Sequence, residues 1–300
     1  MNKKTLMLGI SSILFSSTIY AEQYRIISPH PDDALLVFGG YLSSLNLNND
    51  SDERIVDVMF STSNYSTNHL DVLTNKRIST VSHLRYIEDY DALTDLFESW
   101  DNFKYRNYGY YDAPLRLYEG DLTAGGGPAG TFKNFRQVEI DTFNMMVHSF
   151  ESILKNENCT LLVPIANGLH IDHFMTKEAV ITAAYRLAEQ AKCKIIFGQD
   201  QPYTNANPNN TDTEIDALRS RLPANAISEM TYDVPIESGT TENIKLYKFK
   251  RYYFTQYDDG YLEPLKSNLT EVVYIWDPST YGTIKSHADC DGSDYCRLAL

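Results

Sequence analysis

The sequence predicts an α/β protein in which helices cover both faces of a mostly parallel sheet and a β-rich extension follows. Between residues 24 and 198, short apolar runs alternate with longer stretches of helical periodicity, and beyond residue 214 the pattern becomes β-type. The 300 residues are 43% hydrophobic, which is enough for one large core. We therefore predict a single domain over residues 22–300, with its core at about 24–200 and its extension at about 214–300.

The first half of the core alternates strand and helix. Tyr24–Ser28 is a short β-type run that ends at a proline-containing loop. The next segment, Ala34–Leu45, has apolar residues at intervals of three and four, as a helix requires. Arg54–Phe60 is expected to form the second strand, and Ile78–Phe97 has the length and periodicity of a helix.

The second half continues the alternation. Phe103–Tyr111 and the apolar run Thr160–Ile165 are expected to be strands, with a helix over Phe135–Leu154 between them. Phe174–Gln190 has helical spacing, and Lys194–Gly198 is a further apolar strand. The strand–helix–strand order indicates βαβ units and hence parallel pairing.

Two polar segments interrupt this pattern. The glycine-rich residues 124–130 lack the Gly-Lys-Ser/Thr ending of a phosphate-binding loop, so we expect a linker or an active-site lid. Residues 203–213 are rich in Asn and Thr and are expected to be an irregular break. Beyond them Met230–Ile236, Lys245–Tyr257 and Val272–Trp276 are rich in β-branched and aromatic residues and are expected to be strands.

The first 21 residues have the features of a secretory signal peptide. A basic start at Lys3 and Lys4 precedes the uncharged, mostly apolar Thr5–Ile19, and the small Ala21 lies at the expected cleavage point. The apolar segment is short for a membrane span, which needs about 20 residues. We therefore expect a secreted or periplasmic protein with no membrane span after cleavage, the alternative being an uncleaved N-terminal anchor.

The charge balance is strongly acidic. The formal net charge is −14, and removal of Lys3 and Lys4 would leave 24 basic and 40 acidic residues, or −16. Such a charge repels phosphate backbones and anionic lipids. Nucleic-acid and membrane-surface partners are therefore not expected.

The four cysteines all follow the predicted signal segment. An even count in an oxidising compartment favours disulfides. Cys290 and Cys296 flank a short polar loop and are expected to pair. Cys159 and Cys193 precede two apolar runs that, as neighbouring parallel strands, would bring them within disulfide reach. Free buried thiols are the alternative for both pairs.

Two clusters of polar residues are candidates for chemistry. His30-Pro31-Asp32-Asp33 follows the first expected strand, and His170-Ile171-Asp172-His173 follows the fourth. With the common strand order 3-2-1-4-5, the first and fourth strands are neighbours across the switch point where ligands bind in open α/β sheets. We therefore expect the two clusters to meet.

The two clusters together supply three histidines and three aspartates. Two imidazoles and one carboxylate, with a position left open for water, form a catalytic zinc shell. A further carboxylate and a further imidazole would suit metal-assisted hydrolysis of an amide or ester. Taken singly, Asp32, Asp33 or Asp172 would also serve as a helix N-cap.

The segment Ser28-Pro29-His30-Pro31-Asp32-Asp33-Ala34, followed by Gly39-Gly40, resembles the opening motif of the PIG-L/LmbE-like family of zinc-dependent N-acetylglucosaminyl deacetylases. His170-Ile171-Asp172-His173 is similar to the second motif of that family. Arg85 with Glu88 and Ala92 is similar to its central helix, and Lys248 with Phe254-Thr255-Gln256 loosely resembles a later segment. The resemblance covers about residues 24–200 and implies a Rossmann-like fold.

The resemblance also implies the metal ligands. His30, Asp33 and His173 would hold Zn²⁺, and Asp32 would be the general base. The family motif has Glu where this chain has Ala34, so a supporting carboxylate is missing while the ligands and the base are retained.

The remaining roles follow from the same resemblance. His170, in protonated form, would face the reacting carbonyl and stabilise the oxyanion, and Asp172 would orient a histidine. Arg85 and Asp112 would contact the substrate. The implied activity is removal of an acetyl group from an N-acetylamino sugar, either a small molecule or an oligosaccharide. The alternatives are a metal-dependent amidase with a non-sugar substrate and a non-catalytic exported sugar-binding protein.

Overall fold

The computed structural model describes residues 22–45, 52–66, 75–98, 103–116, 129–156, 159–206, 208–223, 225–256 and 259–278. The predicted signal segment, residues 124–128 of the glycine-rich loop and the predicted Cys290–Cys296 disulfide lie outside these ranges.

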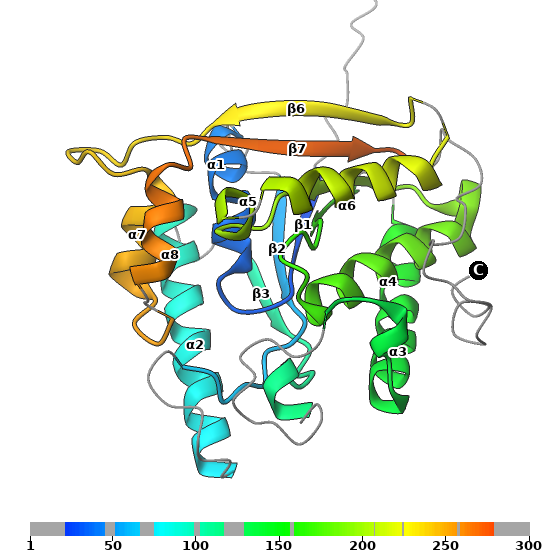
Figure 1. Cartoon of the computed structure of the whole chain (residues 1–300), viewed down its shortest axis with the longest axis horizontal. Coiled ribbons are helices and arrows are strands. Elements are labelled where there is room, and N and C mark those ends of the chain that lie inside the picture. Colours follow the sequence, from blue (N-terminus) through cyan, green and yellow to red (C-terminus); the bar gives the residue numbers. More distant parts are fainter. Residues whose placement is uncertain are drawn as a thin grey trace, which may run out of the picture.

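A single sheet of seven strands, with order β3-β2-β1-β4-β5-β7-β6, organises the described chain (Figure 1). The pairs from β3 to β5 are parallel, and β7 and β6 add antiparallel strands at one edge. The predicted order 3-2-1-4-5 is confirmed, as is the mostly parallel α/β fold. The strands are β1 (Gln23–Ser28), β2 (Glu53–Val58), β3 (Lys104–Asn107), β4 (Cys159–Pro164), β5 (Lys194–Gly198), β6 (Ile227–Asp233) and β7 (Thr270–Trp276).

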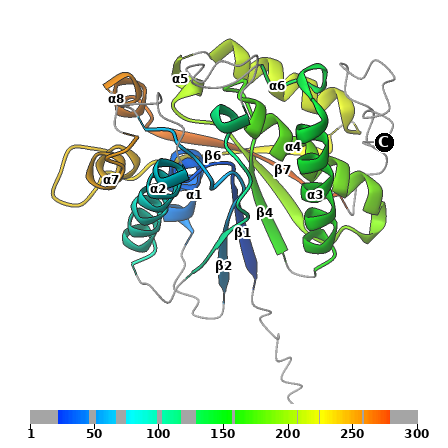
Figure 2. The same ribbon diagram turned by 90° about the horizontal axis from the view of Figure 1, so that it is seen from below.

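Helices cover both faces of the sheet, with α1 and α2 on one face and α3 and α4 on the other (Figure 2). No helix among the described residues is both long and apolar enough to cross a membrane. The helices are α1 (Asp33–Ser44), α2 (Asn75–Leu96), α3 (Gln137–Leu154), α4 (Ile171–Leu187), α5 (Tyr203–Ala206), α6 (Pro208–Arg221), α7 (Ile244–Tyr252) and α8 (Asp259–Lys266), and short 3₁₀ helices lie at Ala113–Arg116, Phe132–Asn134 and Ala188–Gln190.

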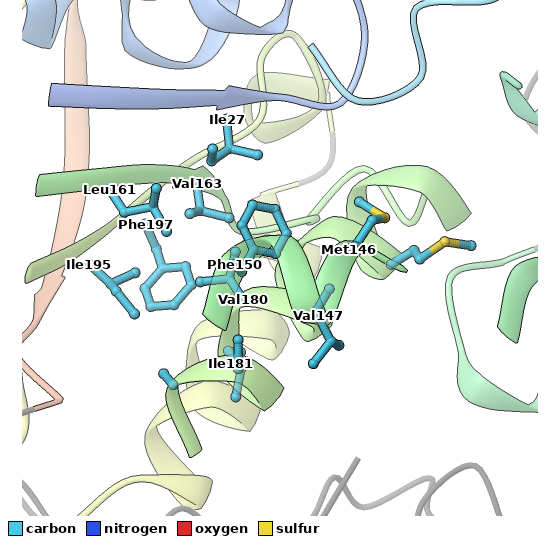
Figure 3. Packing of buried hydrophobic residues seen from close by; sticks show 14 of the residues in the cluster. Ile27, Met146, Val147, Phe150, Leu161, Val163, Val180, Ile181, Ile195 and Phe197 are labelled. Carbon is cyan, nitrogen blue, oxygen red and sulfur yellow. The ribbon is translucent and has the colours of Figure 1, made fainter. Parts of the chain in front are cut away.

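Strand alternation divides the core into two layers. Ile27 points to the layer formed with α3 and α4, where it packs near Phe150 and Val180 (Figure 3). Its neighbour Ile26 points to the opposite layer and packs with Phe38 of α1. Because successive residues of a strand face opposite sides, β1 can be buried on both faces, as a central parallel strand is.

Helix α1 is buried on all sides because a further layer covers it. Leu35 and Leu36 form a cluster with Leu246 and Phe249 of α7 and with residues of α8. All residues of α1 from Asp33 to Leu42 are buried. The C-terminal part of the chain thereby fixes the helix that begins directly after Asp32.

A buried carboxylate, itself paired with a lysine, joins the extension to α1. Glu271 of β7 accepts hydrogen bonds from the backbone N–H groups of Gly40 (2.9 Å) and Tyr41 (2.6 Å). The Lys245 ammonium donates to the same carboxylate at 2.6 Å. A Cβ atom at Gly40 would lie 2.9 Å from Val234 Cγ2 and 3.0 Å from the Glu271 carboxylate, so a larger residue there would displace these side chains.

Two predictions about the extension are wrong. Residues 203–213, expected to be irregular, lie largely in α5 and α6, and Pro208 occupies the first position of α6, where a proline is tolerated. Lys245–Tyr257, expected to be a strand, contains α7. The Asn243 side chain caps this helix by accepting from the Leu246 N–H, and Leu246 and Phe249 recur at helical spacing. The many aromatic residues of the segment favoured a strand prediction over its short helical periodicity.

The predicted Cys159–Cys193 disulfide is also not formed. The two cysteines lie at the starts of adjacent strands, as expected, but both are buried free thiols. The Cys193 thiol donates instead to the backbone carbonyl of Ile153 at 3.4 Å. Its hydrogen bond to Cys159, together with burial, raises the pKa of Cys193, so this thiol stays protonated.

Candidate metal centre and active site

The two predicted clusters meet at the carboxyl ends of β1 and β4. His30 lies in the loop between β1 and α1, and His173 lies in the first turn of α4. Three donor atoms approach one another there: the distance from His30 Nδ1 to His173 Nε2 is 3.3 Å, from His30 Nδ1 to Asp33 Oδ2 is 3.3 Å, and from His173 Nε2 to Asp33 Oδ2 is 3.3 Å. They form an equilateral triangle.

The size of this triangle fits zinc. Tetrahedral Zn²⁺ has ligands at about 2.0–2.2 Å, and the edge of such a tetrahedron is about 3.3–3.6 Å. His30, Asp33 and His173 thus present donor atoms at the separation of three corners, and the fourth corner is left for water or substrate. Donor atoms of His30, His170 and His173 also lie within 4.8 Å of one another, a looser set.

The imidazoles and carboxylates of the triangle shift one another's pKa. Burial disfavours protonation of His173, but Asp33 and Asp200 outweigh burial and raise its pKa to about 10. Burial acts against ionisation of Asp33, yet His173 and His30 hold the pKa of Asp33 well below its usual range. The site therefore favours an ionised carboxylate, the form that binds a metal, and a cation displaces the protons held by the imidazoles.

Asp32 lies beside the triangle but is not used as a helix cap. It occupies the N-cap position of α1, yet its side chain makes no capping hydrogen bond. Its backbone φ is 140°, a strained value for a residue other than glycine. Burial and the neighbouring Asp33 charge raise the pKa of Asp32 to about 8, although Arg85, 3.8 Å away, opposes this shift. A strained, poorly solvated carboxyl with a raised pKa is suited to accept a proton.

Asp172 orients His30. Its Oδ2 atom lies 3.1 Å from His30 Nε2 and also accepts from the Ala113 N–H at 3.0 Å. Its Oδ1 atom accepts from Arg116 at 2.6 Å, and Arg116 in turn donates to Glu139 at 2.8 Å. Because this network holds Nε2 of His30, the ring presents Nδ1 to the triangle.

Asp200 orients His173 in the same way. Its carboxylate makes a short hydrogen bond to His173 Nδ1, which directs Nε2 toward Asp33. The Asp200 side chain is itself held by the backbone N–H of Asn167 at 3.1 Å. The sequence reasoning missed both Asp200 and Arg116. Asp200 follows β5 just as His30 follows β1, and this position was its only signal.

His170 is placed at the pocket in its neutral form. Its Nδ1 atom accepts from the backbone N–H of Asp172 at 3.2 Å, so the ring proton is on Nε2. Burial and the charges of His30 and His173 lower the pKa of His170 to about 3, against the opposing effect of Asp172. The expectation of a protonated His170 is therefore corrected: the available donor is a neutral imidazole N–H.

Arg85 and Asp112 hold each other. Arg85 Nη1 lies 3.3 Å from Asp112 Oδ2, and the Ser63 hydroxyl donates to the same oxygen at 2.7 Å. Asp112 Oδ1 lies 3.4 Å from His30 Nε2. The family resemblance implies that both residues contact substrate. The structure places both at the pocket, where each of the two Asp112 carboxylate oxygens already has a partner.

A small pocket of about 60 Å³ opens above these residues. Seven of the eight predicted site residues line it, namely His30, Asp32, Asp33, Arg85, Asp112, His170 and His173. Tyr65, Gln201 and Tyr203, which the sequence did not indicate, also line it, as does Gln256 from the segment of loose resemblance. Gln201 is 4% exposed, and its side-chain Oε1 has no hydrogen-bond partner among the described residues. This oxygen can accept a hydrogen bond from a bound molecule.

Comparison with known proteins relates this fold to deacetylases. No protein-family model and no curated sequence matches the chain. Among solved structures, a deacetylase of the teicoplanin biosynthesis pathway is 17% identical, with a TM-score of 0.55 over 84% of this chain and 97% of its own. The zinc-inhibited form of teicoplanin deacetylase gives the same values.

A third solved structure, the A40926 pseudoaglycone deacetylase, is 18% identical, with a TM-score of 0.51 over 85% of this chain and 96% of its own. The chain thus has the fold of these deacetylases across nearly their whole length. The Rossmann-like fold expected from the resemblance to the PIG-L/LmbE-like family is confirmed.

Proposed function

We propose that the protein is a zinc-dependent N-deacetylase of the PIG-L/LmbE-like family that acts on an N-acetylamino sugar or its glycoconjugate. The observation that carries the proposal is the 3.3 Å triangle of His30, Asp33 and His173 beside the uncapped, strained Asp32. The deacetylase activity named for the structures of similar fold supports it.

In this proposal His30, Asp33 and His173 hold the zinc ion. A zinc ion so held would acidify water and polarise the acetyl carbonyl, as in other zinc hydrolases. Asp32 accepts the proton of the attacking water, and its poorly solvated carboxyl makes it a stronger base than an exposed aspartate. Arg85, 3.8 Å from Asp32, keeps the carboxylate directed into the pocket.

His170 acts on the carbonyl oxygen. Its Nε2–H donates a hydrogen bond to the developing oxyanion, and such a donor typically contributes about 3–4 kcal/mol to transition-state stabilisation. The proton taken by Asp32 then passes to the leaving nitrogen, so that the C–N bond breaks to give acetate and a free amine. No net proton is taken from the protein over the cycle.

We further propose that the protein is secreted or periplasmic, on the basis of the basic start, apolar segment and Ala21 described above. N-terminal sequencing of protein from the extracellular and periplasmic fractions tests this assignment. A mature chain that begins at Glu22 is expected, and a chain that retains Met1 in the cytosolic fraction would contradict it.

The activity is tested by acetate release from N-acetylglucosamine and tri-N-acetylchitotriose by zinc-loaded protein at pH 9, where Asp32 is largely ionised. Asp32→Asn is expected to lower kcat at least about 100-fold, because general-base catalysis contributes about 10²–10⁴, while zinc content stays unchanged. The exposed Asp141→Asn is the matched control. No acetate from either sugar, or an Asp32→Asn enzyme within a factor of three of the wild type, would contradict the proposal.

A further inference from the structure

A second, larger pocket lies beside the candidate active site. Its volume is about 550 Å³, against about 60 Å³ for the first pocket. Its walls come from the loop after β2, the region after β3 and the first half of α2, and include Ser61, Ser79, Ser82, Tyr86, Asn107 and Tyr111. None of these residues has a part in the mechanism above.

Residues that are neighbours in the sequence line the two pockets. Pro31 lines the larger pocket and Asp32 the smaller one. Tyr111 lines the larger pocket, and the next residue, Asp112, lines the smaller one. On α2, Tyr86 lines the larger pocket and Arg85 the smaller. Since neighbouring residues of three separate segments face the two pockets, a ligand that extends out of the first one passes next to the second.

The difference in size determines what each pocket holds. A buried water needs about 10–15 Å³ by this measure, so the smaller pocket has room for roughly four to six water-sized groups. An acetamido group fits within that space, but additional sugar rings do not. The larger pocket has about nine times this volume and can receive more than one ring.

The lining of the larger pocket suits a neutral, hydroxyl-rich ligand. Most of its polar side chains are hydroxyls and amides, such as those of Ser79 and Asn107, and the imidazole of His83 is the other polar group. None of the residues that line it is Asp, Glu, Lys or Arg. It also has an aromatic part: Tyr111 is 59% exposed, and the Tyr86 ring stacks on His83 at 6.3 Å. Ring faces of this kind pack against the C–H faces of sugars, and hydroxyls exchange hydrogen bonds with their edges.

We propose that this pocket binds further sugar residues of an oligosaccharide whose acetamido group occupies the smaller pocket. The inference rests on the proposed deacetylase function and narrows its substrate class from amino sugars in general to sugar chains. A neutral chain also avoids the repulsion that an anionic ligand would meet from a protein of net charge −14.

The test blocks the pocket without touching the metal site. Ser79 is exposed on α2 and lines the pocket, whereas the next residue, Thr80, is also exposed but does not line it. Ser79→Trp should lower the ratio of kcat/KM for tri-N-acetylchitotriose to kcat/KM for N-acetylglucosamine at least tenfold. Thr80→Trp should leave the ratio within twofold of wild type. Equal ratios in the two variants would overturn the proposal.

A binding measurement separates this proposal from the proposed function. Calorimetric titration measures the affinity of tri-N-acetylchitotriose for zinc-loaded Asp32→Asn protein, in which turnover is blocked. The same measurement is made on two double variants, in which Asp32→Asn is combined with Ser79→Trp or with Thr80→Trp. Binding that is at least tenfold weaker with Ser79→Trp, but not with Thr80→Trp, supports the subsite. A wild type that releases no acetate would count against the deacetylase proposal but not against the subsite. Absence of binding, or equal weakening by both tryptophans, would overturn the subsite.

Discussion

His30 Nδ1 and His173 Nε2 lie 3.3 Å apart, although 143 positions separate the two residues in the chain. The parallel pairing of β1 with β4 produces this approach, because the loops that follow neighbouring parallel strands leave the sheet at the same edge. Each imidazole is then turned by its own carboxylate, Asp172 for His30 and Asp200 for His173. The fold supplies proximity, and the two aspartates supply orientation.

Asp200→Asn tests the orientation of His173. The amide cannot bear the charge that holds the Nδ1 proton, so the ring loses its fixed orientation and basicity. Loss of a partner of this kind typically weakens metal binding about 10–100-fold. Competition with a chromophoric zinc chelator measures the affinity, and the exposed Asp216→Asn is the matched control. Equal zinc affinities for the two variants would show that Asp200 does not orient the ligand.

Asp32→Asn should stabilise the metal-free protein at high pH. The folded-state pKa of Asp32 is about 8, against 3.8 as its ordinary value, so the folded protein keeps a proton that the unfolded chain has lost. The free energy of unfolding therefore falls as pH rises between these values, by at most about 1.4 kcal/mol per pH unit. Asparagine removes this loss.

Urea unfolding of the chelator-treated wild type and Asp32→Asn at pH 5 and pH 9 measures the effect. The gain in unfolding free energy from the substitution is expected to be larger at pH 9 than at pH 5, while Asp141→Asn gives no such trend. A gain that is the same at both pH values would mean that Asp32 ionises normally in the folded protein.

Lys245→Met tests the junction between the extension and α1. Lys245 is fully buried, and its loss leaves the Glu271 carboxylate buried without its cation. Breaking a buried pair in this way typically costs about 3–5 kcal/mol of unfolding free energy. Lys250 lies on the same helix but is exposed, and Lys250→Met should change stability by less than about 0.5 kcal/mol. Chemical unfolding measures the free energy of unfolding of both variants. A similar loss for Lys245→Met and Lys250→Met would show that the buried pair does not stabilise the junction.

The sheet could be predicted from sequence because its strands carry a strong signal. β4 and β5 contain apolar runs, and β1 is a short β-type run that ends at a proline-containing loop. The alternation of these strands with amphipathic segments indicates parallel pairing. The extension could not be predicted as well. In α7 the β-type composition outweighs a short helical period, and in α6 the many Asn and Thr residues mask a helix that begins at Pro208.

The candidate site was predictable where residues cluster in the sequence. His30, Asp32 and Asp33 lie together, as do His170, Asp172 and His173, and each cluster lies between a strand and the start of the next helix or in that helix's first turn. Asp200 and Arg116 are single residues without a motif, and only the fold brings Asp200 to His173 and Arg116 to Asp172, the partner of His30. The charge state of His170 likewise depends on burial and on neighbouring imidazoles, which no local pattern contains.

We expect His30, Asp33 and His173 to hold the metal and His170 to act on the substrate. Chelator competition on the purified proteins compares the zinc affinities of Asp33→Ala and His170→Ala. Asp33→Ala should bind zinc at least 100-fold more weakly than the wild type. His170→Ala should keep its zinc affinity within tenfold of the wild type and lose acetate release. Tight zinc binding by Asp33→Ala, together with loss of zinc binding by His170→Ala, would show that these roles are wrongly assigned.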